Sequence, residues 1–311
     1  MDSHHAQLMA WNIDGPLTAE RTARMIGDPR FPDAVRALAS NMIAAAASDK
    51  KLDGIFKDGG RYVAAMLAVH LHTSGGLTLP RLKQMCQAFG YLSPGRARAM
   101  LIYLQYLGYV ELTRSGTPAR YAPTTSFVTS WRSHLCAALE AVRVVEPSVD
   151  LVLGRMDERD TLDTFARMHT ECLLAWARNG GHDAPFIRVF THRYAGSQII
   201  WTLLLADDSD FPPSKPVTFS AGAAARRFSV SRMHIKRILD EAEREGLLRF
   251  GDGGTIVLQD STRSYIREFY AMQLIGLLVA AAKTVRERPE LDSEPGPPRR
   301  AAEQGGEAAA L

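Results

Sequence analysis

Basic side chains cluster directly after a serine in the second half of the chain, and their spacing could support recognition of an anion. They lie on the first turns of an expected helix, within SVSRMHIKR; the residues are Ser231, Arg232, His234, Lys236 and Arg237. A serine caps a helix by accepting a hydrogen bond from a backbone N–H two or three residues on. The N-terminus of a helix already carries positive potential, so cations at that end are not stabilised by the helix. We therefore expect them to meet negative groups outside the fold.

An earlier stretch, YLSPGRARAM, has a related design. Its serine is expected to cap a helix that has proline at the first position, followed by two arginines. Further cations lie on the preceding helix and beside the following hairpin. The candidate anion-binding residues of this region are Arg81, Lys83, Ser93, Arg96, Arg98, Arg114 and Arg120. Each phosphate that such residues neutralise would add affinity and salt dependence.

The two stretches lie at equivalent places in a predicted internal duplication. Residues 77–112 align with 217–250, so that Ser93 matches Ser231 and Gly108 matches Gly246. Identity between the halves is low, and the prediction depends on the common order of elements over roughly half the chain. Each half is expected to contain two helices, a short extended entry, a helix–turn–helix, a β-hairpin and a final long helix.

The expected boundaries follow from this repeat. We predict a first unit at 30–146, a second at 160–285 and a linker at 147–159 that carries Pro147. The tail at 286–311 is rich in Pro, Gly and Glu and is expected to be disordered.

Helix, turn, helix and hairpin in succession predict a winged helix-turn-helix. The hairpins are expected at 109–123 and 247–259, where SGTP and GDGG supply the turns. The predicted fold class is mainly α with small β-hairpin wings (α+β), arranged as two tandem winged helix-turn-helix units with flanking long helices. A helix fits the major groove of B-form DNA, and its first turns approach the bases.

Residues 228–248 resemble the helix-turn-helix of bacterial regulators of the GntR and MarR types, in the run V-S-R-x-x-I-K-R-x-L-D-x-x-E-R-E-G-L-L. The layout of each half, with helices before and a long helix after the winged core, is more similar to the MarR type. This resemblance implies dimerisation through the terminal helices, DNA recognition by helix and wing, and often a small-molecule pocket near the dimer helices. Such chains usually carry one unit, so two linked copies would form a pseudo-dimer.

The expected function is therefore a sequence-specific transcriptional regulator that binds double-stranded DNA and is cytoplasmic and bacterial. Two alternatives stay open. Tandem winged helices also occur in plasmid replication initiators, and winged helices serve as protein-interaction modules that bind no DNA. The first unit is the one expected to lose DNA contact, because the later part of its second helix is strongly apolar.

Composition and motifs disfavour other classes of protein. A formal net charge of +3 over 311 residues makes local clustering the only case for an acidic partner. No common enzyme motif, metal-ligand spacing or cofactor fingerprint occurs, so we expect no catalysis, metal or cofactor. The three cysteines and the absence of a signal peptide favour a reducing compartment. The apolar run 271–282 is too short for a membrane span, and no membrane partner is expected.

Aromatic residues on helices that should meet between the halves form a second candidate site. Core packing is the default role for such residues. The competing hypothesis is a pocket for a small-molecule effector, since ligand sites are concave and largely apolar. The candidate pocket residues are Tyr62, Trp131, Trp176, Tyr194 and Trp201. A homodimer is a further possible assembly.

Overall fold

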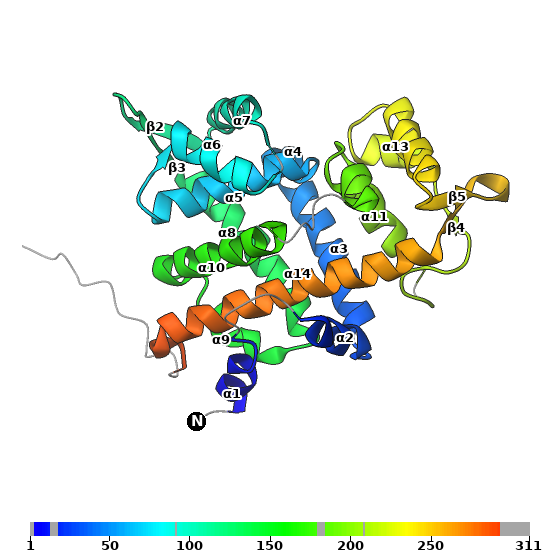
Figure 1. Ribbon diagram of the computed structural model, residues 1–311, viewed down its shortest axis with the longest axis horizontal. Coiled ribbons are helices and arrows are strands. Elements are labelled where there is room, and N and C mark those ends of the chain that lie inside the picture. The colour runs from blue at the N-terminus through cyan, green and yellow to red at the C-terminus, as the bar shows by residue number, and fades with distance from the viewer. Residues whose placement is uncertain (1–2, 13–17, 91, 179–183, 208, 293–311) are drawn as a thin grey trace, which may run out of the picture.

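The structure, a computed structural model, describes residues 3–12, 18–90, 92–178, 184–207 and 209–292. Over these residues the chain is mainly helical, with two small antiparallel sheets of three strands each. Figure 1 shows the elements of the two halves as two lobes at the upper edge of the view, above one long helix.

The two lobes have the same order of elements. The first comprises α5 (Gly59–Thr73), β1 (Leu77–Thr78), α6 (Leu79–Ala88), α7 (Pro94–Tyr106), β2 (Val110–Arg114) and β3 (Arg120–Pro123). The second comprises α11 (Gly196–Leu204), β4 (Val217–Thr218), α12 (Ala221–Arg227), α13 (Arg232–Arg244), β5 (Leu248–Phe250) and β6 (Thr255–Leu258). The strand orders, β1-β3-β2 and β4-β6-β5, are also the same. The expected extended entry, helix pair and hairpin therefore occur in both halves.

Backbone detail supports the sequence alignment of the halves. Gly108 and Gly246 follow α7 and α13, and both have a φ of +69°, the left-handed conformation that closes a helix. Their amides donate to the carbonyls three residues earlier, at Gln105 and Glu243. The chain therefore leaves the second helix of each lobe by the same turn and enters the same hairpin.

The helices that flank the lobes pack against elements of both halves. Helix α3 (Phe31–Ser48) packs against α8 (Thr125–Arg143) of its own half and against α11 of the second lobe. Helix α10 (Arg159–Arg178) packs against α14 (Asp260–Glu287) of its own half and against α5 of the first lobe. Residues 30–146 and 160–285 therefore share one hydrophobic core.

Short elements complete this core. They are α1 (Ser3–Met9), α2 (Ala19–Gly27), α4 (Lys50–Phe56), the 3₁₀ turn η1 (Pro147–Val149), α9 (Asp150–Leu153), the π-helical turn η2 (Ile187–Thr191) and the 3₁₀ turns η3 (Asp252–Gly254) and η4 (Pro289–Asp292). The expected linker at 147–159 carries η1 and α9, and its Val149, Val152 and Met156 are buried. This segment joins the halves as part of the core.

The expectation of disorder from residue 286 onward is wrong for its first residues. Helix α14 continues to Glu287, and η4 follows it with Leu291 buried. Arg288 donates to Thr161 Oγ1 at 2.8 Å, which holds this end against α10. The composition of the tail gave no sign of these contacts because they form with residues far away in sequence. Residues 293–311 lie outside the described residues.

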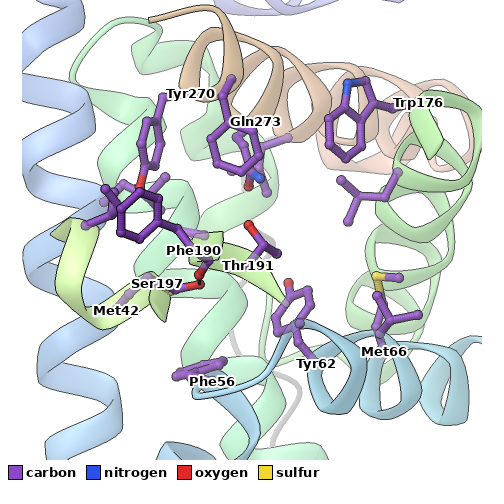
Figure 2. A pocket seen from close by; sticks show the side chains of 18 of the residues that line it. Met42, Phe56, Tyr62, Met66, Trp176, Phe190, Thr191, Ser197, Tyr270 and Gln273 are labelled. Atoms are coloured by element: carbon purple, nitrogen blue, oxygen red, sulfur yellow. Dashed lines mark hydrogen bonds between the residues drawn. The ribbon is translucent and has the colours of Figure 1, made fainter. Parts of the chain in front are cut away.

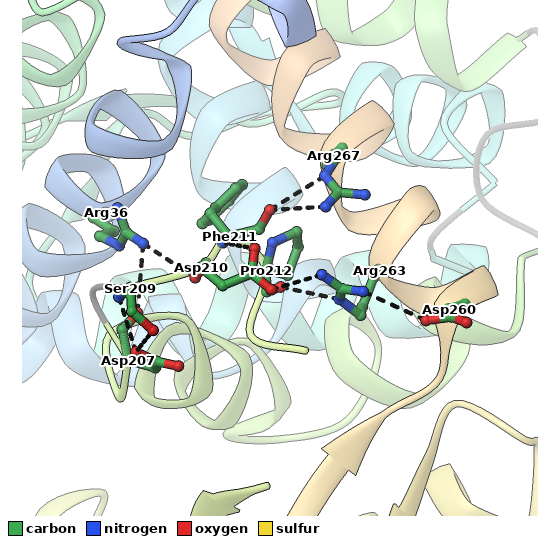
Figure 3. A network of polar contacts seen from close by, with 9 residues as sticks. All are labelled: Arg36, Asp207, Ser209, Asp210, Phe211, Pro212, Asp260, Arg263 and Arg267. Carbon is green, nitrogen blue, oxygen red and sulfur yellow. Dashed lines mark hydrogen bonds and ion pairs between the residues drawn. The ribbon is translucent and has the colours of Figure 1, made fainter. Parts of the chain in front are cut away.

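A network of arginines fixes the connection between α11 and β4, which has twelve residues (205–216) where the first half has three (74–76) (Figure 3). Arg36 of α3 donates to the carbonyl of Asp210 at 3.1 Å. Arg263 of α14 donates to the Asp210 carboxylate at 2.9 Å, and Arg267 donates to the carbonyl of Phe211 at 3.0 Å. Because α3 and α14 both hold this connection, the second lobe has a defined position on the helical body.

Helix α14 is the one described helix that is long and apolar enough to cross a membrane by length and composition. Most of its apolar window, 78%, is buried inside the protein. The apolar run 271–282, expected to be too short to span a membrane, lies within this longer helix. The burial of its apolar window is that of a core helix.

Candidate functional site

The first turns of α13 present cations with no intramolecular compensation. Ser231 caps the helix, as expected, by accepting from the amide of His234 at 3.0 Å. Arg232, Lys236 and Arg237 are exposed, and none has a carboxylate partner among the residues that the structure describes. Ile235 and Ile238 face inward and are buried. The amphipathic pattern therefore directs the cationic face to solvent.

The glutamates toward the C-terminal end of the same helix form contacts with other parts of the protein. Arg188 donates to Glu245 at 2.9 Å, and Arg193 donates to Glu241 at 2.6 Å. Glu243 accepts from the amide of Phe250 at 3.1 Å. Glu241 and Glu245 are therefore paired with arginines, whereas Arg232, Lys236 and Arg237 have no carboxylate partner among the described residues.

His234 does not belong to that outward face. Its Nε2 lies 2.7 Å from the carbonyl oxygen of Tyr194, to which it donates, and its side chain is half-buried. This bond attaches α13 to the segment that precedes α11. The sequence placed His234 with the anion-binding residues because the helix was considered alone, without the chain that packs on it.

The first lobe keeps the cap but uses two of its predicted cations internally. Ser93 accepts from the amide of Arg96 at 3.3 Å. The Arg96 guanidinium donates to Asp58 at 2.7 Å. Arg81 donates to the carbonyls of Ser74 and Gly76 at 2.8 and 2.9 Å, and so fixes the turn before β1. Both arginines have partners within the protein, so they are less available to bind an external anion.

The remaining candidates of the first lobe are at its surface. Arg98 on α7 is exposed and Lys83 on α6 is half-buried. Arg114 ends β2 and Arg120 begins β3, where both are exposed beside the hairpin turn. They are spread over four elements, whereas the cations of α13 are on adjacent turns of one helix.

The outward face of α7 is apolar where that of α13 is charged. Ile102 is 55% exposed and Tyr106 is 85% exposed. Counting from the capping serines, these positions correspond to Asp240 and Arg244 of α13. The exposed Leu112 on β2 adds to this surface. The later part of α7 was expected to be apolar, and the structure shows that much of this apolar surface is exposed.

Three further cations of the second lobe were not selected from the sequence. Arg226 and Arg227 end α12 directly before the turn into α13, and Arg249 lies on β5; all three are exposed. The run AAARRFSVSR contained the signal for the first two. Arg249 could have been found only by placing the hairpin beside the helix.

A partly open cavity of about 160 Å³ lies where the two halves meet. Tyr62, Trp176 and Trp201 line it, as the sequence hypothesis required (Figure 2). Trp131 does not line it; it is buried behind Tyr62, with ring centroids 5.4 Å apart. Tyr194 also does not line the cavity, because its ring packs against Arg61 at 5.1 Å. Both residues were expected on helices that meet between the halves; Trp131 is on α8, but Tyr194 lies in the turn before α11.

Two buried histidines in the cavity wall are neutral at physiological pH. Burial lowers the pKa of His134 to about 3, with a smaller contribution from His169, and burial lowers the pKa of His169 to about 4. His134 Nε2 lies 3.1 Å from the Tyr62 hydroxyl. Its Nδ1 is buried without a hydrogen-bond partner. No signal in the sequence would place either histidine in the cavity wall.

A polar bridge next to the cavity joins the lobes. The Arg61 guanidinium packs on the rings of Tyr103, at 4.6 Å, and Tyr194, at 5.1 Å. Tyr103 belongs to α7, and the Tyr194 carbonyl accepts from His234 of α13. Lys57, which is buried, pairs with Asp53, and Asp53 also accepts from Gln198 of α11 at 2.9 Å. The second helices of the two lobes are thus connected through a few side chains.

Comparison with known proteins gives no match: no family model fits the chain, and no curated protein and no solved structure is significantly similar to it. Among the described residues, no group of three His, Cys, Asp or Glu side chains could hold a metal ion. The surface of α13 and the cavity are therefore the two features that bear on function.

Proposed function

We propose that the chain is a cytoplasmic, sequence-specific regulator of transcription that binds double-stranded DNA and acts by binding, not catalysis. In this proposal the lobes are two tandem winged helix-turn-helix units, in which α7 and α13 are the recognition helices and the β2–β3 and β5–β6 hairpins are the wings. The duplication makes one chain a pseudo-dimer. The observation that carries the proposal is the uncompensated cationic face at the start of α13.

The second lobe is the principal DNA-binding unit in this proposal. Arg232, Lys236 and Arg237 would enter a major groove, where arginine pairs well with guanine edges. Arg226, Arg227 and Arg249 flank the same helix and would contact phosphates, which supply much of the affinity. The first lobe would add backbone contacts through Lys83, Arg98, Arg114 or Arg120.

A second candidate function is favoured for the first lobe. Winged helices also bind other proteins, and exposed apolar side chains on a recognition helix suit such a partner better than DNA. Ile102, Tyr106 and Leu112 supply that surface. In this version one lobe positions the chain on DNA and the other recruits a protein.

A replication initiator would differ in its target, with directly repeated sites at an origin.

Selection of bound duplexes from a random DNA library, at near-physiological salt, tests the proposal. We expect enrichment of one strong half-site, with a weaker one about one helical turn away, roughly 34–36 Å, if the first lobe also contacts bases. Affinity for the selected duplex should fall steeply with salt, because each neutralised phosphate adds a slope of about 0.9 in log K against log salt.

A matched control separates specific binding from general attraction of basic surfaces. The same titration is done with a scrambled duplex of equal length and composition. Absence of enrichment, together with a flat salt response, would contradict DNA binding. Enrichment of two directly repeated sites of equal strength would favour the initiator.

A further inference from the structure

The cavity between the halves has walls from both of them. Tyr62 and Met66 come from α5 of the first lobe, and Thr191 comes from η2 just before α11. Trp176 of α10 and Gln273 of α14 close the opposite side (Figure 2). A space of about 160 Å³ is close to the roughly 150 Å³ of an engineered protein cavity that binds benzene. The cavity is therefore large enough for a molecule built on one aromatic ring.

The chemistry of the walls limits the charge of an occupant. None of the described residues that line the cavity is Arg, Lys, Asp or Glu. Phe56, Phe190, Trp201 and Tyr270 present ring surfaces, against which an aromatic ring packs well. The two histidines are neutral, and an ionised ligand buried there would lack a counter-charge. The walls therefore favour an uncharged aromatic molecule.

A few polar groups in the walls would fix the orientation of an occupant. Figure 2 shows the polar ends of Tyr62, Thr191 and Gln273 facing the same space from three different elements. His134 also lines the cavity; it is only 4% exposed, and its Nδ1 has no partner. Buried polar atoms in proteins are almost always hydrogen-bonded. The polar groups of Tyr62, Thr191 and Gln273 in the wall favour an occupant with its own hydrogen-bonding group.

We infer that the cavity binds an uncharged aromatic molecule of about one ring that carries a hydrogen-bonding group, and that its binding changes the placement of the two lobes. The regulatory part of this inference rests on the proposed function. Ligand sites of this kind are largely apolar, with a small number of polar groups that fix orientation.

The connection to the lobes runs through adjacent residues. Tyr62 in the wall follows Arg61, which packs on Tyr103 of α7. Thr191 in the wall precedes Tyr194, whose carbonyl accepts from His234 of α13. An occupant that moves α5 relative to η2 therefore moves α7 relative to α13. A ligand shifts the equilibrium between two arrangements only if it binds one of them better.

The site is tested on the full chain without DNA, using benzamide and benzoate as probes. The two have the same shape, and only benzoate carries a charge. Binding is followed through the indole N–H resonances of Trp176 and Trp201 during titration. We expect a dissociation constant for benzamide at least ten times lower than for benzoate. Equal or tighter binding of benzoate, or no perturbation by either probe at millimolar concentration, would overturn the inference.

Two variants that fill the cavity from opposite walls locate the binding. Leu173→Trp and Gln273→Trp replace half-buried lining residues, and each should lower benzamide affinity at least tenfold. Leu153→Trp, which replaces a half-buried leucine on α9 away from the cavity, should leave it unchanged. Retained affinity in a filled variant with a native-like thermal transition would place the probe elsewhere and refute the site.

The regulatory part is measured separately, as the affinity for the selected duplex with and without benzamide. We expect at least a threefold change in the unmodified chain and no change in Leu173→Trp. Benzamide binding without any change in DNA affinity would refute regulation and leave the ligand site. Benzamide binding by a chain that binds no duplex would refute the proposed function alone.

Discussion

The two lobes have the same order of elements, but the outward faces of their second helices differ in chemistry. In both, a serine caps the second helix and a glycine with a φ of +69° ends it. Position by position, however, Ala99 of α7 corresponds to Arg237 of α13, and Ile102 corresponds to Asp240. The fold of a lobe is fixed by its inward residues and turns, whereas its binding chemistry depends on outward residues that folding does not constrain. Duplication can therefore keep one function and release the other copy for a second.

The comparison is tested most strongly by removing cations from the second lobe. Arg232→Ala with Arg237→Ala should weaken binding to the selected duplex by about 2–6 kcal/mol, since each base-contacting arginine contributes about 1–3 kcal/mol. Fluorescence anisotropy at fixed salt measures this loss.

The matched change in the first lobe is Arg98→Ala, at the position of Lys236. We expect the free energy of binding to the selected duplex to weaken by about 1 kcal/mol or less, because Arg98 would contact at most a phosphate. A larger loss from Arg98→Ala than from the double variant would reverse the assignment of the two lobes.

Acid should destabilise the shared core through its neutral histidines. The unfolded chain protonates each near its usual pKa of 6.5, whereas the folded chain keeps His134 and His169 neutral to about 3 and 4. Their contribution is therefore complete above pH 6.5 and is lost as the pH falls below it, at up to about 1.4 kcal/mol per pH unit for each histidine.

A substitution taken from the other half isolates this effect. His134 lies ten residues after the N-cap of α8, and Phe269 lies ten after that of α14. His134→Phe should reduce the pH dependence of unfolding between pH 6.5 and 5 by about 1 kcal/mol per unit. Urea unfolding at several pH values measures it, with the exposed His4→Phe as the control. An unchanged slope would mean that His134 is not neutral in the fold.

The glycines that end α7 and α13 should be equally sensitive. Gly108→Ala and Gly246→Ala each place a side chain at a φ of +69°, which costs about 1–2 kcal/mol of stability. No backbone atom approaches either added Cβ, so the cost should come from conformation alone. Thermal unfolding of the pair is the measurement. A difference above about 1 kcal/mol would show that the two turns are not equivalent.

The smallest effect is expected at Arg96, which is paired with Asp58. Arg96→Gln should reduce stability by less than about 1 kcal/mol, because the Arg96 side chain is 44% exposed and such ion pairs contribute little. DNA affinity should not change. A loss of DNA affinity tenfold or greater would show that Arg96 leaves Asp58 to bind DNA.

Local features were predictable from the sequence, and long-range pairings were not. The caps at Ser93 and Ser231 and the two hairpins follow from nearby residue types, and the structure confirms them. The partners of Arg96 and His234 lie 38 and 40 residues away in the sequence, and no periodicity contains that information. The exposure of Tyr106 was hidden for the same reason, since an apolar helix face indicates burial until its neighbours are known.

The packing of flanking helices against both halves has a consequence for how the chain is made. Helix α3 packs against α11, about 150 residues later in the sequence, and α5 packs against α10, which also follows it in the sequence. During synthesis the first half therefore leaves the ribosome with apolar surface that only later residues can cover. Contacts between residues so distant in sequence slow folding and expose intermediates to aggregation. A nascent chain of this design is a natural client for chaperones until α11 and α14 have emerged.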